Sequence, residues 1–112
     1  MIEGSCHCGK IRLSLDAAPS EAIECNCSHC SRKGLILTFV PRDKLKVDAD
    51  PADVATYTFN KHVIQHRFCR TCGVQPYAEA EGKDGPTAAI NLRCFEIDLA
   101  KLAIKPFDGK DL

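Results

Sequence analysis

Three thiols lie within six residues of one another in the segment Cys25-Asn26-Cys27-Ser28-His29-Cys30. Soft metal ions such as zinc prefer thiolate ligands, and zinc is usually held by four ligands. A local set of three therefore needs either a distant fourth ligand or a water or substrate molecule in the fourth position. The first arrangement is structural, whereas the second leaves the metal open for chemistry.

Two further cysteine pairs lie at opposite ends of the chain. Cys6 and Cys8 are two residues apart, so on an extended segment both thiols point to the same side. Cys69-Arg70-Thr71-Cys72-Gly73 has the spacing of a zinc knuckle, in which backbone N–H groups turn toward the sulfurs and glycine takes the positive-φ corner. Because each pair needs two more ligands, we predict one closed site of four thiolates that joins them.

The eighth cysteine, Cys94, leaves two interpretations of the three-thiol segment open. If Cys94 is the fourth ligand, the second site is closed and purely structural. If Cys94 is a small hydrophobic core residue, as free cysteines often are, the second site keeps an open position. Spacing alone does not separate these two arrangements.

The composition narrows the class of protein. The 112 residues include 15 basic and 15 acidic side chains, so the formal charge is zero, which argues against a nucleic-acid or acidic-membrane surface. No apolar stretch approaches the roughly 20 residues of a membrane span, and the first residues lack the pattern of a secretion signal. We therefore expect a cytoplasmic protein, in which eight cysteines indicate metal binding; disulfide bonds are the alternative.

The hydropathy pattern predicts strands. Residues 10–16 alternate between polar and apolar, which is typical of a half-buried strand, and the apolar run 35–40 ends at Pro41 as a central strand should. Residues 56–59 and 62–68 flank Asn60-Lys61, which favours a hairpin with a tight turn.

Helical signals are few. Residues 31–34 suggest one helical turn that ends at Gly34, and Asp98 is a plausible cap for a short turn over 99–102. The half-polar tail 104–112 is expected to drape over the sheet. Short strands and tight turns together predict an all-β fold: a single domain, 1–112, of small sheets whose orientation is fixed by metal clips.

Four segments occur in an order that resembles one known family: residues 4–9, 25–30, 68–73 and 90–94. The family is that of the glutathione-dependent formaldehyde-activating enzymes, to which centromere protein V is related, and its fold is the Mss4-like arrangement of small coiled β-sheets. The resemblance implies two zinc ions per chain, a structural one on Cys6, Cys8, Cys69 and Cys72 and a catalytic one on Cys25, Cys27 and Cys30. Asn91 and Arg93 also match the family's motif, and the namesake enzyme is longer than this chain.

The resemblance implies a carbon–sulfur lyase-type reaction, in which the thiol of glutathione adds to formaldehyde to give S-hydroxymethylglutathione, or the reverse. The partners would be a small-molecule thiol and an aldehyde. His29 and His66 are candidates for proton transfer, although either could be an ordinary hydrogen-bonded or solvated histidine. Arg32 and Lys33 could hold a carboxylate of the substrate, or form a plain charged face.

Two rival functions remain at the level of the sequence. One is a non-catalytic, zinc-stapled binding module, which Cys94 as a fourth ligand would favour and the neutral charge does not. The other is redox sensing by Cys69 and Cys72, which needs a helix N-terminus to activate the thiol, and none is evident there.

Overall fold

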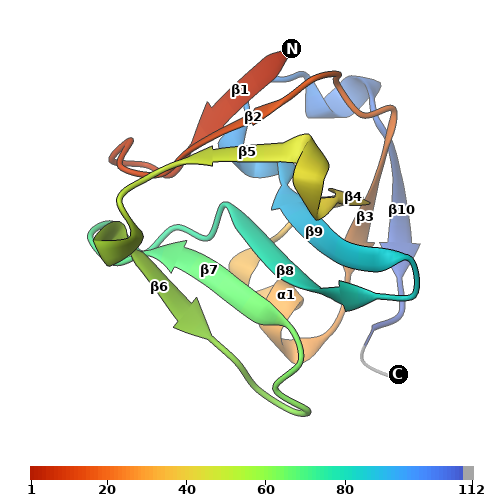
Figure 1. The fold of residues 1–112 in the computed structure, drawn as a ribbon. Coiled ribbons are helices and arrows are strands. Elements are labelled where there is room, and N and C mark those ends of the chain that lie inside the picture. Colours follow the sequence, from red (N-terminus) through yellow and green to blue (C-terminus); the bar gives the residue numbers. More distant parts are fainter. Residues whose placement is uncertain (110–112) are drawn as a thin grey trace.

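The computed structural model describes residues 1–109, and its strands form two sheets (Figure 1). The smaller sheet is antiparallel, in the order β1-β2-β5, with β1 at Ile2–Ser5, β2 at Arg12–Leu15 and β5 at Leu45–Asp48. The predicted alternation is present in β2: Leu13 and Leu15 are buried, whereas Arg12 is exposed. One face of this sheet is therefore core and the other is open to solvent.

The larger sheet has seven strands in the order β10-β3-β4-β9-β8-β7-β6. All of its pairs are antiparallel except that of β10 with β3, which is parallel. The strands are β3 (Glu21–Cys25), β4 (Leu37–Pro41), β6 (Val54–Tyr57), β7 (Gln65–Cys69), β8 (Tyr77–Gly82), β9 (Gly85–Asn91) and β10 (Ala103–Phe107). As predicted, the apolar run over 35–40 supplies an interior strand, but β4 begins at Leu37 and includes Pro41 instead of ending before it.

One short α-helix, α1 (Ser28–Lys33), is present in the described chain. It ends at Gly34 with a φ of 65°, as predicted, but it begins three residues earlier than expected, because the Cys27 side chain accepts a hydrogen bond from the Cys30 N–H and caps the helix. Single 3₁₀ turns occur at Arg42–Lys44, Pro51–Asp53, Leu92–Cys94 and Leu99–Lys101. Within residues 1–109 no helix has the length and apolar character needed to cross a bilayer.

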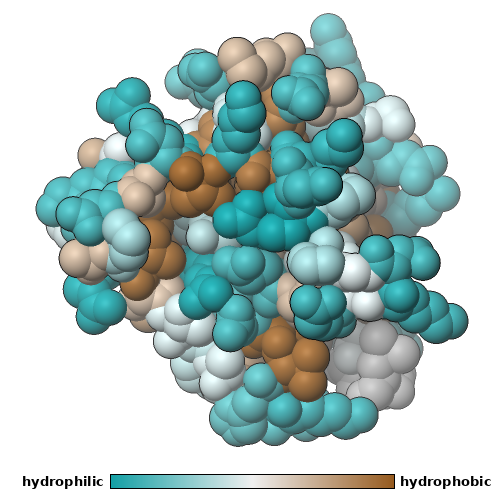
Figure 2. Space-filling model, in the orientation of Figure 1, coloured by the Kyte–Doolittle hydropathy of each residue, from teal (hydrophilic) through white to brown (hydrophobic). Residues whose placement is uncertain are grey.

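The main core lies between the two sheets. It joins buried side chains of the small sheet and the segments beside it to those of β8 and β9, among them Ile11, Leu13, Leu45, Ile90 and Leu92. A second, smaller cluster contains Cys25, Cys30, Leu35 and Leu37. The three-thiol segment is therefore attached to a small core of its own, at the side of the large sheet where α1 packs against β3. On the face shown in Figure 2, hydrophilic residues cover most of the surface and smaller hydrophobic patches lie between them.

The hairpin of β6 and β7 is present, but the predicted tight turn at Asn60-Lys61 is wrong. Tyr57 pairs with His66, so the connection runs over residues 58–64. Two contacts within the loop stabilise its turn: the Thr58 hydroxyl lies 2.8 Å from Nδ1 of His62, and the His62 N–H donates to the Phe59 carbonyl at 2.9 Å. The loop is long enough to reach over the three-thiol segment.

The C-terminal tail does not drape over the sheet but joins it as a strand. Ala103–Phe107 forms β10, parallel to β3, in a register that places Phe107 opposite Cys25. All five residues of β10 are exposed, so no alternation marks it in the sequence, and Pro106 is tolerated because β10 is an edge strand. The rest of the expected tail, residues 110–112, lies outside the described residues. The short turn capped by Asp98 is present as predicted.

Candidate metal centres

The sulfurs of Cys6, Cys8, Cys69 and Cys72 lie within 4.8 Å of one another. The Sγ atoms of Cys6 and Cys8 are 3.7 Å apart, and those of Cys8 and Cys69 are 3.6 Å apart. Four thiolates at about 2.3 Å from a tetrahedral zinc ion would lie about 3.8 Å from one another. The spacing of this cluster therefore fits a closed four-thiolate metal site.

The backbone of the Cys69 knuckle is folded around the sulfur. The N–H groups of Thr71 and Cys72 both donate to the Cys69 sulfur at 3.4 Å, and Gly73 takes a φ of 82° so that its N–H reaches the Cys69 carbonyl at 2.9 Å. Burial opposes ionisation of Cys72, but the N–H groups of Val74 and Cys8 lower its pKa to about 6. Such donors favour the thiolate, which is the form that binds metal.

The second cluster is formed where strand β3 ends and helix α1 begins. Cys25 ends β3, Cys27 caps α1, and Cys30 lies inside that helix; their sulfurs also lie within 4.8 Å of one another. The Cys27 N–H donates to the Cys25 sulfur at 3.5 Å, and the Cys30 N–H donates to the Cys27 sulfur at 3.3 Å. Burial raises the pKa of Cys27, but the Cys30 N–H and neighbouring groups outweigh it and lower the pKa overall. Within residues 1–109 no fourth Cys, His, Asp or Glu joins the group.

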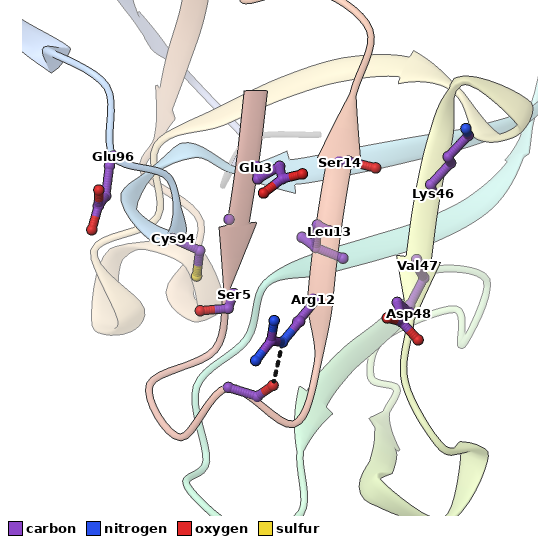
Figure 3. A pocket seen from close by; sticks show the side chains of 12 residues that line it. Glu3, Ser5, Arg12, Leu13, Ser14, Lys46, Val47, Asp48, Cys94 and Glu96 are labelled. Atoms are coloured by element: carbon purple, nitrogen blue, oxygen red, sulfur yellow. Dashed lines mark hydrogen bonds between the residues drawn. The ribbon is translucent and has the colours of Figure 1, made fainter. Parts of the chain in front are cut away.

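Cys94 does not close this second cluster. Its thiol accepts a hydrogen bond from Nδ2 of Asn91 at 3.6 Å, and it lines a different cavity, of about 850 Å³, on the polar face of the small sheet beside β1 (Figure 3). Burial raises the pKa of Cys94 to about 11, with further contributions from Cys6 and Cys72. Of the two interpretations of the second cluster, the geometry supports the open one.

A pocket of about 780 Å³ opens at the second cluster, and all three of its cysteines line it. Most of the other lining side chains are apolar, among them Leu35, Leu37, Phe39, Val63, Ile64 and Phe107. The loop 58–64 and the end of β10 thus contribute walls that lie far from the cysteines in the sequence. Any ligand of a metal held there would enter through this pocket.

The rings of the two candidate histidines pack against each other beside the cluster, tilted by 42°. The ring centroids of His29 and His66 are 4.1 Å apart, and Phe59 lies 5.2 Å from each. Desolvation lowers the pKa of His66 to about 4, with His29 and Lys33 adding to the shift, and burial followed by Lys33 also lowers the pKa of His29. Both imidazoles are therefore neutral at pH 7. Neither ring nitrogen of His29 has a hydrogen-bond partner within residues 1–109.

Lys33 connects to this histidine pair through Gln75. The Lys33 ammonium donates to Oε1 of Gln75 at 2.5 Å, which turns the Gln75 amide nitrogen toward Nδ1 of His66 at 3.5 Å. Burial lowers the pKa of Lys33, although the nearby Cys30 opposes the shift. Arg32 is exposed like Lys33, but its guanidinium donates to the Ser28 carbonyl at 2.9 Å, at the other end of its own helix. The structure brings Lys33 to the site but not Arg32.

Several contributors to the site carry no signal in the sequence. Gln75 and Lys61 line the pocket, yet neither belongs to a cysteine motif. Asn91 and Arg93 match the family's motif, and the structure shows what they contact: Asn91 is buried and donates to the Gln75 carbonyl at 2.9 Å, and Arg93 donates to the Gly34 carbonyl at 2.6 Å, just after α1. The two residues hold the segments that carry Gln75 and Cys30.

Comparison with known proteins agrees with this geometry. A crystal structure of a Rhodobacter sphaeroides protein, a structural-genomics target, superimposes with a TM-score of 0.78 at 25% identity, covering 95% of this chain and 100% of that chain. The sequence profile of the glutathione-dependent formaldehyde-activating enzymes matches residues 1–107. That match spans both cysteine clusters and all the described strands, so the chain belongs to the family of glutathione-dependent formaldehyde-activating enzymes.

Proposed function

We propose that this protein is a zinc-dependent enzyme that adds a thiol such as glutathione to a small aldehyde such as formaldehyde, or catalyses the reverse carbon–sulfur cleavage. The observation that carries the proposal is the second cluster, whose three sulfurs face a pocket of about 780 Å³ with no fourth ligand in the described chain. A three-ligand set with access from outside is the pattern of a catalytic metal site, whereas a closed set of four is structural.

In the proposed reaction the thiol sulfur forms a bond to the carbonyl carbon, the C=O π bond breaks, and the thiol proton ends on the former carbonyl oxygen. No oxidant or reductant is needed. Zinc held by Cys25, Cys27 and Cys30 would supply a soft centre that takes the incoming thiol as its thiolate. The remaining task for the protein is to carry one proton from sulfur to oxygen.

His66 and His29 are the groups we assign to that task. Because the Gln75 amide nitrogen donates to Nδ1 of His66, the neutral His66 ring carries its proton on Nε2, and that N–H can donate to the carbonyl oxygen. His29 is neutral, and its ring nitrogens have no partner in the described chain, so it can accept the proton of the thiol. Lys33 and Gln75 would act as positioning residues that fix the orientation of His66.

For a carboxylate of the thiol, the chain offers cations beside the pocket. Lys61 lines the rim directly, whereas the Lys33 ammonium is held by Gln75. Arg32, the other sequence candidate, is turned toward Ser28, so we assign the carboxylate contact to Lys61 with support from Lys33. Such contacts would orient the thiol rather than take part in bond formation.

We assign a structural zinc to the four-thiolate cluster. It would tie the chain after β1 to the chain after β7, and the binding free energy of structural zinc, about 10–16 kcal/mol, is comparable with the whole stability of a domain of this size. All eight cysteines are free in the structure, and such a set of thiols persists in a reducing compartment such as the cytoplasm.

Cobalt substitution tests the open position directly. In the protein loaded with cobalt in place of zinc, thiolate-to-cobalt charge-transfer absorption grows with the number of bound sulfurs. Adding glutathione should therefore raise this absorption in the wild type and equally in Cys94→Ala, whereas Cys27→Ser should lack the response. Exchange NMR should then show that the zinc form accelerates interconversion of glutathione, formaldehyde and their adduct above the spontaneous rate.

If glutathione leaves the cobalt spectrum unchanged and Cys94→Ala loses intensity without added thiol, the second cluster is closed. The non-catalytic binding module would then replace the enzyme as the better description. Its support in the sequence was Cys94 as a fourth ligand, and the structure places that thiol in another cavity.

A further inference from the structure

The pocket at Cys25, Cys27 and Cys30 is much larger than formaldehyde requires. Its volume is about 780 Å³, in the range of pockets that hold drug-sized ligands. Formaldehyde is about as large as a water molecule, whose share of liquid volume is about 30 Å³. Most of the pocket must therefore accommodate something other than the aldehyde group itself.

The surface of the pocket indicates what that is. Leu35 and Leu37 are buried at the base of the pocket. Phe39, Val63 and Phe107 form its rim, and these three residues are 54%, 57% and 41% exposed. Apolar side chains that stay this exposed around a hollow mark a binding site rather than ordinary surface. The three rim residues come from three separate segments, β4, the loop 58–64 and β10.

Charge complementarity also favours an apolar ligand. Apart from the three cysteines, Lys61 is the one charged residue among the side chains that line the pocket in the described chain. Glutathione carries two carboxylates and one ammonium group, so one lysine matches only part of it. An apolar chain of several carbons, with a reactive group at one end, fits the lining better.

We propose that the substrate of this site carries an apolar body of several carbons, which packs along Leu37, Phe39 and Val63 while its reactive end lies at the three cysteines. The inference rests on the proposed thiol–aldehyde reaction and specifies its substrate class. The reaction is unchanged: a carbon–sulfur bond forms, the carbonyl π bond breaks, and the thiol proton moves to the carbonyl oxygen. The apolar chain belongs to either the aldehyde or the thiol, and two series of substrates distinguish the sources.

The first experiment measures kcat/KM of the zinc-loaded protein above the spontaneous rate. One series combines glutathione with formaldehyde, acetaldehyde, butanal and hexanal; the other combines formaldehyde with 2-mercaptoethanol and 1-pentanethiol. Each buried methylene should raise kcat/KM by about fourfold until the pocket is filled. A rise along the first series assigns the chain to the aldehyde, and a rise along the second assigns it to the thiol.

The second experiment is independent of catalysis. The unreactive probe 1-hexanol should bind the zinc-loaded protein and shift the NMR signals of residues on the pocket wall, including Ala78, Ala89 and Leu37. Ala89→Phe, which fills the pocket from β9, should abolish these shifts. Val63→Asp, at an exposed position of the rim, should weaken binding by about tenfold or more without disturbing the fold. Ile104→Asp is the matched control, because Ile104 is 36% exposed but does not line the pocket.

The outcomes separate this inference from the function on which it rests. Hexanol binding without turnover of any aldehyde supports the apolar ligand class and overturns the proposed enzyme. Turnover of formaldehyde that is flat across both series, without hexanol binding, supports the enzyme and overturns the apolar substrate. Concentration-dependent dimers that Val63→Asp dissociates, again without hexanol binding, also overturn it, because the rim would then be an interface between two copies of the chain.

Discussion

Gly109 packs directly against the sulfur of Cys25, so closely that a β-carbon at position 109 would overlap it. The segment is held in place by the N–H of Asn26, which donates to the Phe107 carbonyl at 3.1 Å, and by the Asn26 side-chain amide, which donates to Asp108 at 3.0 Å. The C-terminal segment is thus a wall of the pocket at the second cluster, and its close approach to Cys25 leaves no room for a side chain at position 109.

Replacing Gly109 by valine should weaken the second site specifically. Overpacking costs about 1–3 kcal/mol, so we expect cobalt affinity of the Cys25–Cys30 cluster to fall by roughly 5- to 160-fold, measured by spectroscopic titration. Lys105→Val, on the exposed strand β10 and outside the pocket lining, is the control and should keep wild-type affinity. Equal affinities in the two variants would show that the tail is not part of the site.

Chelator should remove two metal equivalents in two steps. The first cluster has four thiolates and ties distant segments together, whereas the second has three and lies within six residues. We therefore expect one equivalent to leave early with the fold intact, and one to leave late together with unfolding, measured by metal analysis and circular dichroism on the same samples. Simultaneous loss of both, or a folded protein without metal, contradicts two sites of unequal strength.

Cysteine substitutions should separate the roles of the clusters. Cys8→Ser and Cys72→Ser should lower the free energy of unfolding severely and to a similar degree, because each removes one ligand of the same four-thiolate site. Cys27→Ser should leave a folded protein that holds one zinc. Thermal unfolding with parallel zinc analysis makes the comparison, and the assignment is reversed if Cys27→Ser unfolds the protein while Cys72→Ser is mild.

His66 should titrate near pH 4 and not near the usual 6.5, because desolvation, followed by His29 and Lys33, disfavours its charged form. The folded state therefore binds fewer protons than the unfolded state between these pH values. Stability from neutral His66 is present above pH 6.5 and is lost as the pH falls from 6.5 toward 4. NMR of the ring proton gives the midpoint, and His66→Gln should lose less stability than the wild type over this interval. A midpoint near 6.5 would show that the ring is solvated.

The all-β fold and the grouping of the cysteines follow from local patterns in the sequence. Alternation in β2, the apolar run of β4 and the knuckle that ends at Gly73 are each encoded within a few residues, so they are visible without a structure. Strand β10 is different, because its five residues are all exposed and its pairing with β3 depends on the rest of the sheet. The sequence of such a strand has no periodic pattern of hydropathy from which it could be predicted.

The pocket could not be predicted for the same reason. Its walls combine β4, the loop 58–64 and β10, and the contact of Lys33 with Gln75 spans 42 positions of the chain. The sequence places Arg32 and Lys33 side by side as equal candidates, but the helix points one toward its own first turn and the other toward the histidines. The directions in which the side chains of this six-residue helix point depend on how the helix packs against its neighbours. The spacing of residues in the sequence does not carry that information.

The contact of Gly109 with Cys25 has a practical consequence for anyone who prepares this protein. A polyhistidine tag fused after residue 112 would begin three residues beyond Gly109 and would offer imidazole nitrogens to any metal that the three sulfurs hold. Metal content, cobalt spectra and thiol binding measured on such a preparation would report the tag together with the site. Figure 1 shows the N-terminus on the opposite side of the molecule, and Met1 is 76% exposed, so affinity handles and labels belong there.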